Sequence, residues 1–90
     1  MQDDSAPTDP DAYTDWLKER VGAELRRQRE ARGLSAYALG KVAKVSDQTI
    51  LNIEQGKCER GSVLATMARV ARQFEMRLWE FLRSAEEAEP

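Results

Sequence analysis

The stretch that most restricts the fold of this chain is residues 33–56, which predict two short helices joined by a three-residue turn. Ser35 can cap the first helix, expected over about 36–43, and Ser46 can cap the second, expected over 47–55. The second helix has a polar outer face. A small protein places one helix in the major groove of DNA through this arrangement. The segment therefore predicts a DNA-binding module.

Composition limits the other possibilities. The 90 residues suffice for one domain with a modest core, and a hydrophobic content of 41% argues against global disorder. No apolar run approaches the roughly 18 residues of a membrane span, so we expect a cytoplasmic protein with no membrane partner. Cys58 is the single cysteine and histidine is absent, which excludes an internal disulfide and the common Cys/His metal sites. We expect no metal and no cofactor.

Charge is distributed unevenly along the chain, whose formal net charge is −2. Residues 1–15 hold five aspartates and no basic residue, and residues 86–90 hold three glutamates. Between them, residues 16–85 hold all 14 Lys and Arg against 8 acidic residues, a balance of +6. Such a basic body can bind phosphates. We interpret the acidic ends as solvated and inert, in preference to a regulatory role.

Apolar residues at helical spacing predict three further helices. The first begins at Asp9, where an aspartate cap precedes a proline, and ends at Gly33. Its inward stripe consists of Tyr13, Trp16, Leu17, Val21 and Leu25, continued by Gln28, Arg29 and Arg32. The other two helices are expected over about 63–74, after the cap Ser62, and from about Leu78 into the acidic end.

These elements define the expected organisation of the chain. Residues 1–8 are polar and aperiodic and are interpreted as a disordered acidic tail. Residues 9–85 are expected to form an all-α, compact five-helix bundle with an extended first helix. Its helix-turn-helix core spans residues 33–57, and residues 86–90 form a second acidic tail.

The helix at 47–55 has distinct faces when its residues are placed at 100° intervals. Around Ile50 at the centre of the buried face, Ile53 and Glu54 lie within about 60°. The opposite side and its flanks carry Gln48, Asn52 and Gln55, then Leu51 and Thr49. The polar face therefore points away from the core.

This outer face supplies candidate contacts to DNA. The amides of Gln48 and Asn52 match the edge of adenine, and Leu51 can contact a thymine methyl. The candidate base-reading residues are Gln48, Asn52, Asp47 and Leu51. The candidate phosphate-binding residues around the helix are Lys44, Thr49, Gln55, Lys57 and Arg60.

The segment resembles the helix-turn-helix of the Cro/CI-type repressors, the xenobiotic-response-element family. The pattern aligns without gaps over residues 33–57 at Gly33, Leu34, Ser35, Leu39, Val45, Ser46, Ile50, Ile53, Glu54 and Gly56. The last two helices also resemble the family at Met67, Ala68, Val70, Ala71, Phe74, Leu78, Phe81 and Leu82. The resemblance covers about residues 21–82. It implies a lambda-repressor-like fold and a homodimer that binds an inverted-repeat operator in double-stranded DNA.

Several positions depart from the family pattern. The family usually has alanine at Gly40, so we expect close helix packing there and tolerance of alanine. Lys44 replaces a turn glycine, and a lysine at positive φ costs about 1 kcal/mol. Ala36 cannot make the phosphate contact of the family's glutamine. Asp47 favours the helix dipole but repels a nearby phosphate, and it could instead accept a hydrogen bond from cytosine.

Two kinds of packing contact are also predicted. Arg29 and Glu54 each follow a buried position by four residues, so we expect an ion pair between the first helix and the helix at 47–55, as the resemblance also implies. Trp79 lies beside the apolar stripe of the last helix rather than within it. Trp79 and Met76 are therefore candidates for a dimer surface. A second candidate is the early first helix, which carries Tyr13, Trp16 and Leu17.

Other functional classes fit this sequence less well than DNA binding. An enzyme is disfavoured because the chain lacks histidine, a glycine-rich phosphate loop and a ligand cluster. The alternative is a protein-binding helix-turn-helix module or an antitoxin-type regulator that neutralises a partner protein, which Asp47, Ala36 and the acidic ends favour. A redox role for Cys58, beside Lys57 and Arg60, is a separate hypothesis. An incidental role is the simpler interpretation of a lone cysteine.

Overall fold

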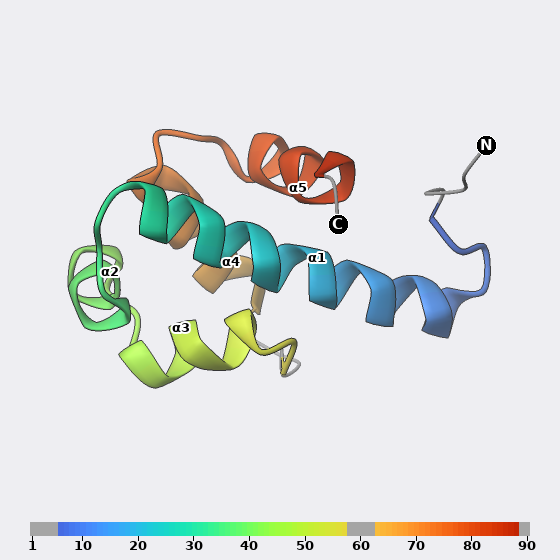
Figure 1. Ribbon diagram of the computed structural model, residues 1–90, viewed down its shortest axis with the longest axis horizontal. Helices are drawn as coiled ribbons and strands as arrows, with labels where there is room; N and C mark the ends of the chain where they lie inside the picture. Colours follow the sequence, from blue (N-terminus) through green and yellow to red (C-terminus); the bar gives the residue numbers. More distant parts are fainter. Residues whose placement is uncertain (1–5, 58–62, 89–90) are drawn as a thin grey trace.

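The computed structural model describes residues 6–57 and 63–88, and within them it contains five α-helices and no strand (Figure 1). The helices are α1 (Pro10–Ala31), α2 (Ala36–Ala43), α3 (Asp47–Glu54), α4 (Val63–Gln73) and α5 (Leu78–Glu87). The predicted all-α bundle with a long first helix is confirmed.

The helix boundaries differ from the expected ones in small ways. α3 ends at Glu54, with Gln55 as its C-cap, and α4 ends at Gln73. α5 continues to Glu87, although an acidic tail was expected from residue 86. Glu86 and Glu87, which were expected in the acidic tail, instead complete the last turn of α5.

Side-chain caps start the first three helices where the sequence predicts them. The Asp9 carboxylate accepts a hydrogen bond from the amide of Ala12 at 2.9 Å. Ser35 and Ser46 do the same for α2 and α3, at 3.0 and 3.1 Å. Each cap satisfies one of the amides that a helix start leaves without a partner. Ser62 lies outside the described residues.

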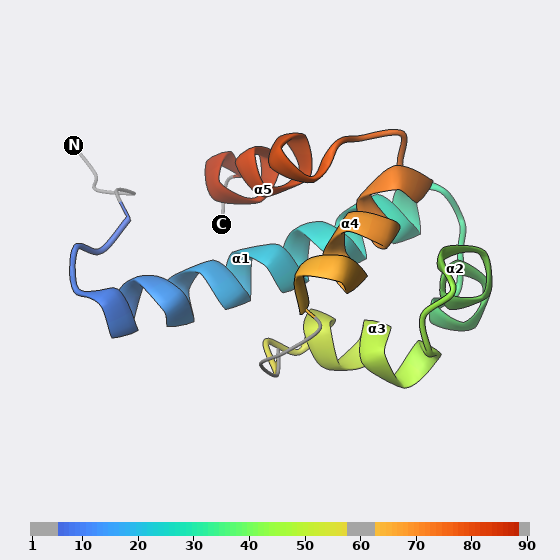
Figure 2. The same ribbon diagram turned by 180° about the vertical axis from the view of Figure 1, so that it is seen from behind.

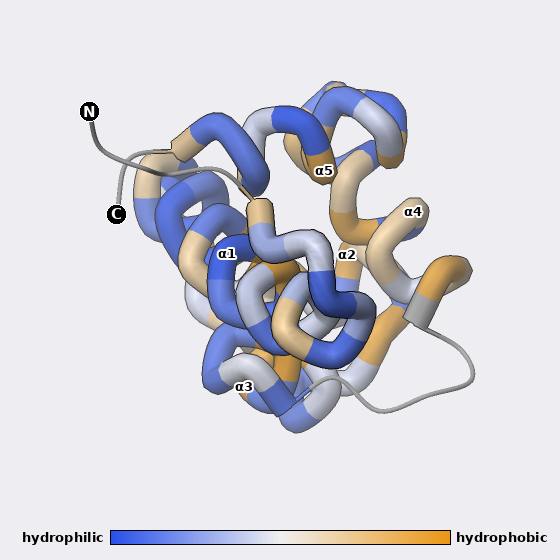
Figure 3. The backbone as a smooth tube through the Cα atoms, turned by 90° about the vertical axis from the view of Figure 1, so that its right-hand side faces the viewer, coloured by the Kyte–Doolittle hydropathy of each residue, from blue (hydrophilic) through white to orange (hydrophobic). Residues whose placement is uncertain are grey.

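α1 is the central helix of the bundle. It contacts α3 on one side and α5 on the other, while α4 joins α2 to α5 (Figures 1 and 2). The core takes apolar side chains from all five helices, namely Val21, Leu25, Leu39, Ala43, Ile50, Ile53, Met67, Val70, Ala71, Phe74, Phe81 and Ala85. Most of α1 is hydrophilic (Figure 3), so only one stripe of it enters this core.

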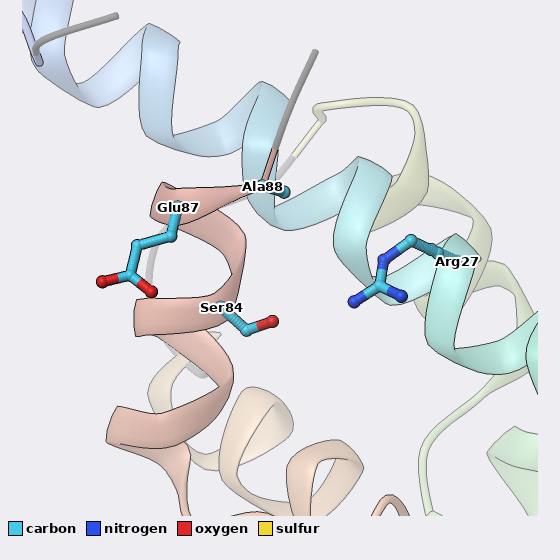
Figure 4. Close-up of a pocket in the computed structure, with 4 residues that line it drawn as sticks. All are labelled: Arg27, Ser84, Glu87 and Ala88. Atoms are coloured by element: carbon cyan, nitrogen blue, oxygen red, sulfur yellow. The ribbon is translucent and has the colours of Figure 1, made fainter.

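The charged residue Glu24 is also buried between α1 and α5, at 1% exposure. Its two oxygens accept hydrogen bonds from Arg27 at 2.6 and 3.0 Å, and Oε2 also accepts from Gln28 and Ser84, both at 2.7 Å. Arg27 and Ser84 approach each other from the two helices at an open depression, where Glu87 points away (Figure 4). The carboxylate thereby joins α5 to α1.

The first turns of α1 hold the end of α5. The Tyr13 hydroxyl donates to a carboxylate oxygen of Glu86 at 2.9 Å. The guanidinium of Arg20 donates to the carbonyl oxygens of Glu86 and Ala88, at 3.1 and 2.7 Å. Arg20 therefore supplies a partner for carbonyls that the last turn of a helix leaves free. Among the described residues, no helix is both long and apolar enough to cross a membrane.

Candidate nucleic-acid interface

α3 lies at the edge of the molecule, across α1 from α5 (Figures 1 and 3). Its inner side packs on α1 and α2 through Ile50 and Ile53, which are 0% and 3% exposed. The outer side is the recognition face, formed by exposed Asp47, Gln48 and Gln55 with half-buried Thr49, Leu51 and Asn52. The two faces lie as the angular placement predicts.

Two amides occupy the middle of the recognition face. Nε2 of Gln48 donates a hydrogen bond to Oδ1 of Asn52, one helical turn further on, at 3.0 Å. A side-chain amide has two donors and an acceptor with two lone pairs, so both groups can make further hydrogen bonds. The contact holds the two amides side by side on the outer side of α3.

The start of α3 is firmly organised by its cap. The hydroxyl groups of Ser46 and Thr49 lie 2.8 Å apart, within hydrogen-bond distance, and the Ser46 hydroxyl also accepts from the Thr49 amide. Thr49 is therefore engaged within the helix itself. Exposed Asp47 occupies the first turn, where a negative charge is favoured by the helix dipole.

In the turn before α3, Lys44 adopts the left-handed backbone conformation that glycine usually occupies. Lys44 has φ 62° and ψ 46°, a region that costs a non-glycine residue of order 1 kcal/mol or more. The carbonyl of Lys44 accepts a hydrogen bond from Arg69 of α4 at 3.3 Å. The sequence indicated the strained lysine but not Arg69, which lies 25 residues away and has no local signal.

Two cations lie beyond the two ends of α3. Lys44 is exposed before its first turn, and Lys57 is exposed after its last, with its amide donating to the carbonyl of Asn52 at 2.8 Å. Of the other candidates near this end, Gln55 is exposed and serves as the C-cap. Arg60 and Cys58 lie outside the described residues.

Arg29 and Glu54 form an ion pair beneath the recognition face. Two hydrogen bonds of 2.6 and 2.9 Å join the guanidinium to the carboxylate, and a third, of 2.9 Å, runs from Arg29 to the carbonyl of Leu34. Their side chains are only 13% and 6% exposed. The hydrogen bond to Glu54 is the main reason that the pKa of Arg29 is raised. The pair joins α1, the following loop and α3.

Gly40 allows α2 to approach the start of α3, as expected, but the expectation that alanine is tolerated here is wrong. A Cβ on Gly40 would lie 2.4 Å from the carbonyl oxygen of Val45, a main-chain atom that cannot rotate away. The alanine of the family pattern does not predict tolerance here, because the distance between the backbone of α2 and that of the turn before α3 depends on how this chain packs.

The substitution Gly40→Ala is expected to lower the free energy of unfolding by about 1–3 kcal/mol, because the added methyl overpacks the contact. Thermal unfolding measures the loss, with Lys41→Ala on the exposed side of the same helix as the control. Equal melting temperatures for the two variants would contradict the close approach.

The dimer candidates have different surroundings. Trp79 is 57% exposed, while Met76 is half-buried against the core. Trp16 stacks on Tyr13 with ring centroids 5.7 Å apart and lies under the guanidinium of Arg20, 4.6 Å from its centre. The structure therefore uses Met76 and Trp16 mainly within the chain and leaves Trp79 as the exposed candidate.

Comparisons with known proteins agree with this geometry. A family model of the helix-turn-helix domain matches residues 20–73, more than half of the chain. Among solved structures, the chain is similar to the clp gene regulator ClgR from Corynebacterium glutamicum, with a TM-score of 0.65 and 28% sequence identity over 77% of this chain and 71% of that one. A search of the curated proteins found no match. The chain belongs to the helix-turn-helix domain family, and it is a DNA-binding protein of the kind that regulates transcription.

Proposed function

We propose that this protein is a sequence-specific regulator that binds double-stranded DNA and acts as a repressor or autoregulator. The observation that carries the proposal is the recognition face of α3, where the amides of Gln48 and Asn52 lie side by side on a helix whose inner side packs on α1 and α2. A helix of this kind enters the major groove with its outer side against the base edges. The similarity to a gene regulator supports the same function.

The residues of the recognition face divide into two roles in this proposal. Gln48 and Asn52 read base edges, assisted by Leu51 against a thymine methyl and by Asp47 toward cytosine. Contacts to phosphates come from the groups around the helix, Lys44, Thr49, Gln55, Lys57 and Arg60. Such phosphate contacts fix the position of a protein on the duplex without carrying sequence information.

The two roles predict different effects of mutation. Asn52→Ala is expected to weaken binding to the preferred site by about 1–3 kcal/mol and to relax the preference at one base pair. Lys57→Ala is expected to weaken binding equally on all sequences and to reduce the slope of log affinity against log salt by about one unit. Selection from a random DNA pool, followed by affinity measurements over a salt series, separates them.

The control for the charge removed in Lys57→Ala is Arg72→Ala, because Arg72 is exposed on α4, which packs on α2 and α5 and carries no residue of the recognition face. This control should bind as the parent does. A parent protein that enriches no motif at moderate salt would overturn the sequence-specific proposal. It would support the alternative of a helix-turn-helix module that binds a protein partner.

We further propose that two copies of the chain bind an inverted repeat whose half-sites lie about one helical turn apart. Exposed Trp79, in a shallow depression that it forms with Leu82, Arg83, Glu86 and Glu87, is the surface that we assign to the dimer. Large exposed aromatic side chains are typical of such contacts.

The dimer predicts that light scattering without DNA gives twice the 10.2 kDa mass of one chain at high micromolar concentration. Trp79→Ala is expected to return the mass to that of one chain. Leu64→Ala removes a side chain that is 70% exposed on α4 and should leave the dimer intact. A parent that stays at the mass of one chain would contradict a stable dimer.

A further inference from the structure

Gly22 lies buried in α1 and faces the last turn of α3. A Cβ built on Gly22 would lie 2.5 Å from the carbonyl oxygen of Ile53 and 2.9 Å from that of Glu54. Both oxygens belong to the main chain of α3, the helix that carries the recognition face. No change of side-chain rotamer therefore makes room for a Cβ on Gly22. The two backbones touch here with no side chain between them.

The other end of α3 is held in the same manner. At the start of the helix, the missing side chain of Gly40 leaves the backbone of α2 against Val45 and Asp47. The recognition helix is thus fixed at its two ends by main-chain contacts with two different helices. The ion pair of Arg29 and Glu54 adds a third contact, at the same end as Gly22.

A methyl group on Gly22 would therefore act on one end of α3 only. The C-terminal end has to move away from α1 by several tenths of an ångström to about 1 Å, while Gly40 continues to hold the start. A helix of eight residues is about 12 Å long, so a shift of 1 Å at one end is a tilt of about 5°. Asn52, in the second turn, moves further than Gln48, in the first.

We propose that Gly22 is a positioning residue for DNA reading, whose missing side chain sets the tilt of α3 in the major groove. The inference rests on the proposed function. Hydrogen bonds between side chains and bases tolerate only a few tenths of an ångström in length. A tilt of this size therefore changes the base contact of Asn52, whereas the long and flexible side chain of Lys57, which moves with the same end of α3, can still reach a phosphate.

The test compares Gly22→Ala with the parent and with a variant that is destabilised elsewhere. Phe81→Leu serves as that control, because Phe81 is fully buried in α5, which packs on α1 and α4. Each variant is also made with Glu75→Gly, which relieves an exposed residue at φ 63° between α4 and α5 and so restores stability away from α3. All measurements use temperatures at which circular dichroism shows folded protein.

The readouts are the motif selected from a random DNA pool, the affinity for the parental site and the salt slope. Gly22→Ala is expected to change the preference at the base pair that depends on Asn52 and to weaken the parental site on the order of tenfold. Its salt slope should equal that of the parent. Phe81→Leu should keep the parental motif, affinity and slope.

Each other outcome decides against the inference. If the parent selects a motif and Gly22→Ala selects the same one with unchanged affinity, Gly22 has a structural role only, and the proposed function stands. If Gly22→Ala does not fold even with Glu75→Gly, α3 cannot tilt to admit the methyl, and the positioning role is overturned. If the parent selects no motif, the proposed function fails and the inference fails with it.

Discussion

Replacing Glu54 by glutamine is expected to lower the free energy of unfolding by about 3–5 kcal/mol, because it leaves the nearly buried guanidinium of Arg29 without its carboxylate. Both side chains are largely shielded from solvent, at 13% and 6% exposure, so water compensates only in part for the lost charge. For a domain of this size, the loss corresponds to a fall in melting temperature of more than about 10 °C. Thermal and urea unfolding, followed by circular dichroism, measure it.

An exposed pair provides the matched control for this prediction. Arg26 and Glu30 are 65% and 56% exposed, so Glu30→Gln should lower the free energy of unfolding by less than about 1 kcal/mol. Replacing Arg29 by methionine and Glu54 by leucine together should cost less than either single replacement, because no unpaired charge stays buried. A loss for Glu54→Gln no larger than that for Glu30→Gln would show that the pair contributes nothing to the fold.

Replacing Glu24, the second buried carboxylate, by alanine is expected to lower the free energy of unfolding by about 3 kcal/mol. The substitution takes away the acceptor for Ser84 and Gln28, and hydrogen bonds to a charged group contribute more than neutral ones. It also opens space between α1 and α5. Ser84→Ala removes only one of these hydrogen bonds and should cost about 1 kcal/mol, which makes it the graded control.

The contribution of Glu24 also depends on pH. Burial, the largest influence, acts to raise the pKa of Glu24, but hydrogen bonds from Arg27, Gln28 and Ser84 outweigh it and the pKa lies below its ordinary value of 4.5. A pKa that is lower in the folded chain than in the unfolded one stabilises the fold above the unfolded value. That stabilisation is lost as the pH falls through the folded pKa.

Unfolding free energies of the parent and Glu24→Ala, measured from pH 7 to pH 2, test this linkage. Their difference should be constant at pH 6–7, where the carboxylate is ionised in both states, and should shrink as the solution is acidified below about 4.5. The exposed Glu30, paired with Arg26, is the control, since Glu30→Ala should change this profile little. A difference that does not depend on pH would contradict the lowered pKa of Glu24.

The helix-turn-helix segment could be predicted from the sequence because its signals are local. Capping serines three residues before the amides that they bind, and apolar residues at helical spacing, define α2 and α3 to within one residue. Arg29 and Glu54 could be paired because the buried face of each helix follows from that spacing. None of these inferences requires the distance between two helices.

What sequence reasoning missed depends on such distances. Glu24 lies three residues after Val21 and immediately before Leu25, a buried position by periodicity, yet its partner Ser84 is 60 residues away and gives no local signal. Gly22 lies inside α1 for a reason that only the distance between the backbones of α1 and α3 reveals, and at Gly40 the close packing was expected but not how little room it leaves for a methyl group. The contacts that hold Glu86 also come from far along the chain, from Tyr13 and Arg20, and gave no local signal.

The eight residues of α3 limit how much sequence information one copy of the chain can extract. At about 12 Å, the helix spans roughly three to four base pairs of DNA, whose rise is about 3.4 Å. A word of four base pairs recurs by chance roughly once in 250, whereas a genome offers about 10⁶–10⁹ competing positions. The two copies that we propose on an inverted repeat would together read about eight base pairs, and the deformability of the DNA between them would add further discrimination. In that proposed arrangement, the number of copies bound, rather than the contacts of one copy, sets how rare a site in a genome this protein can select.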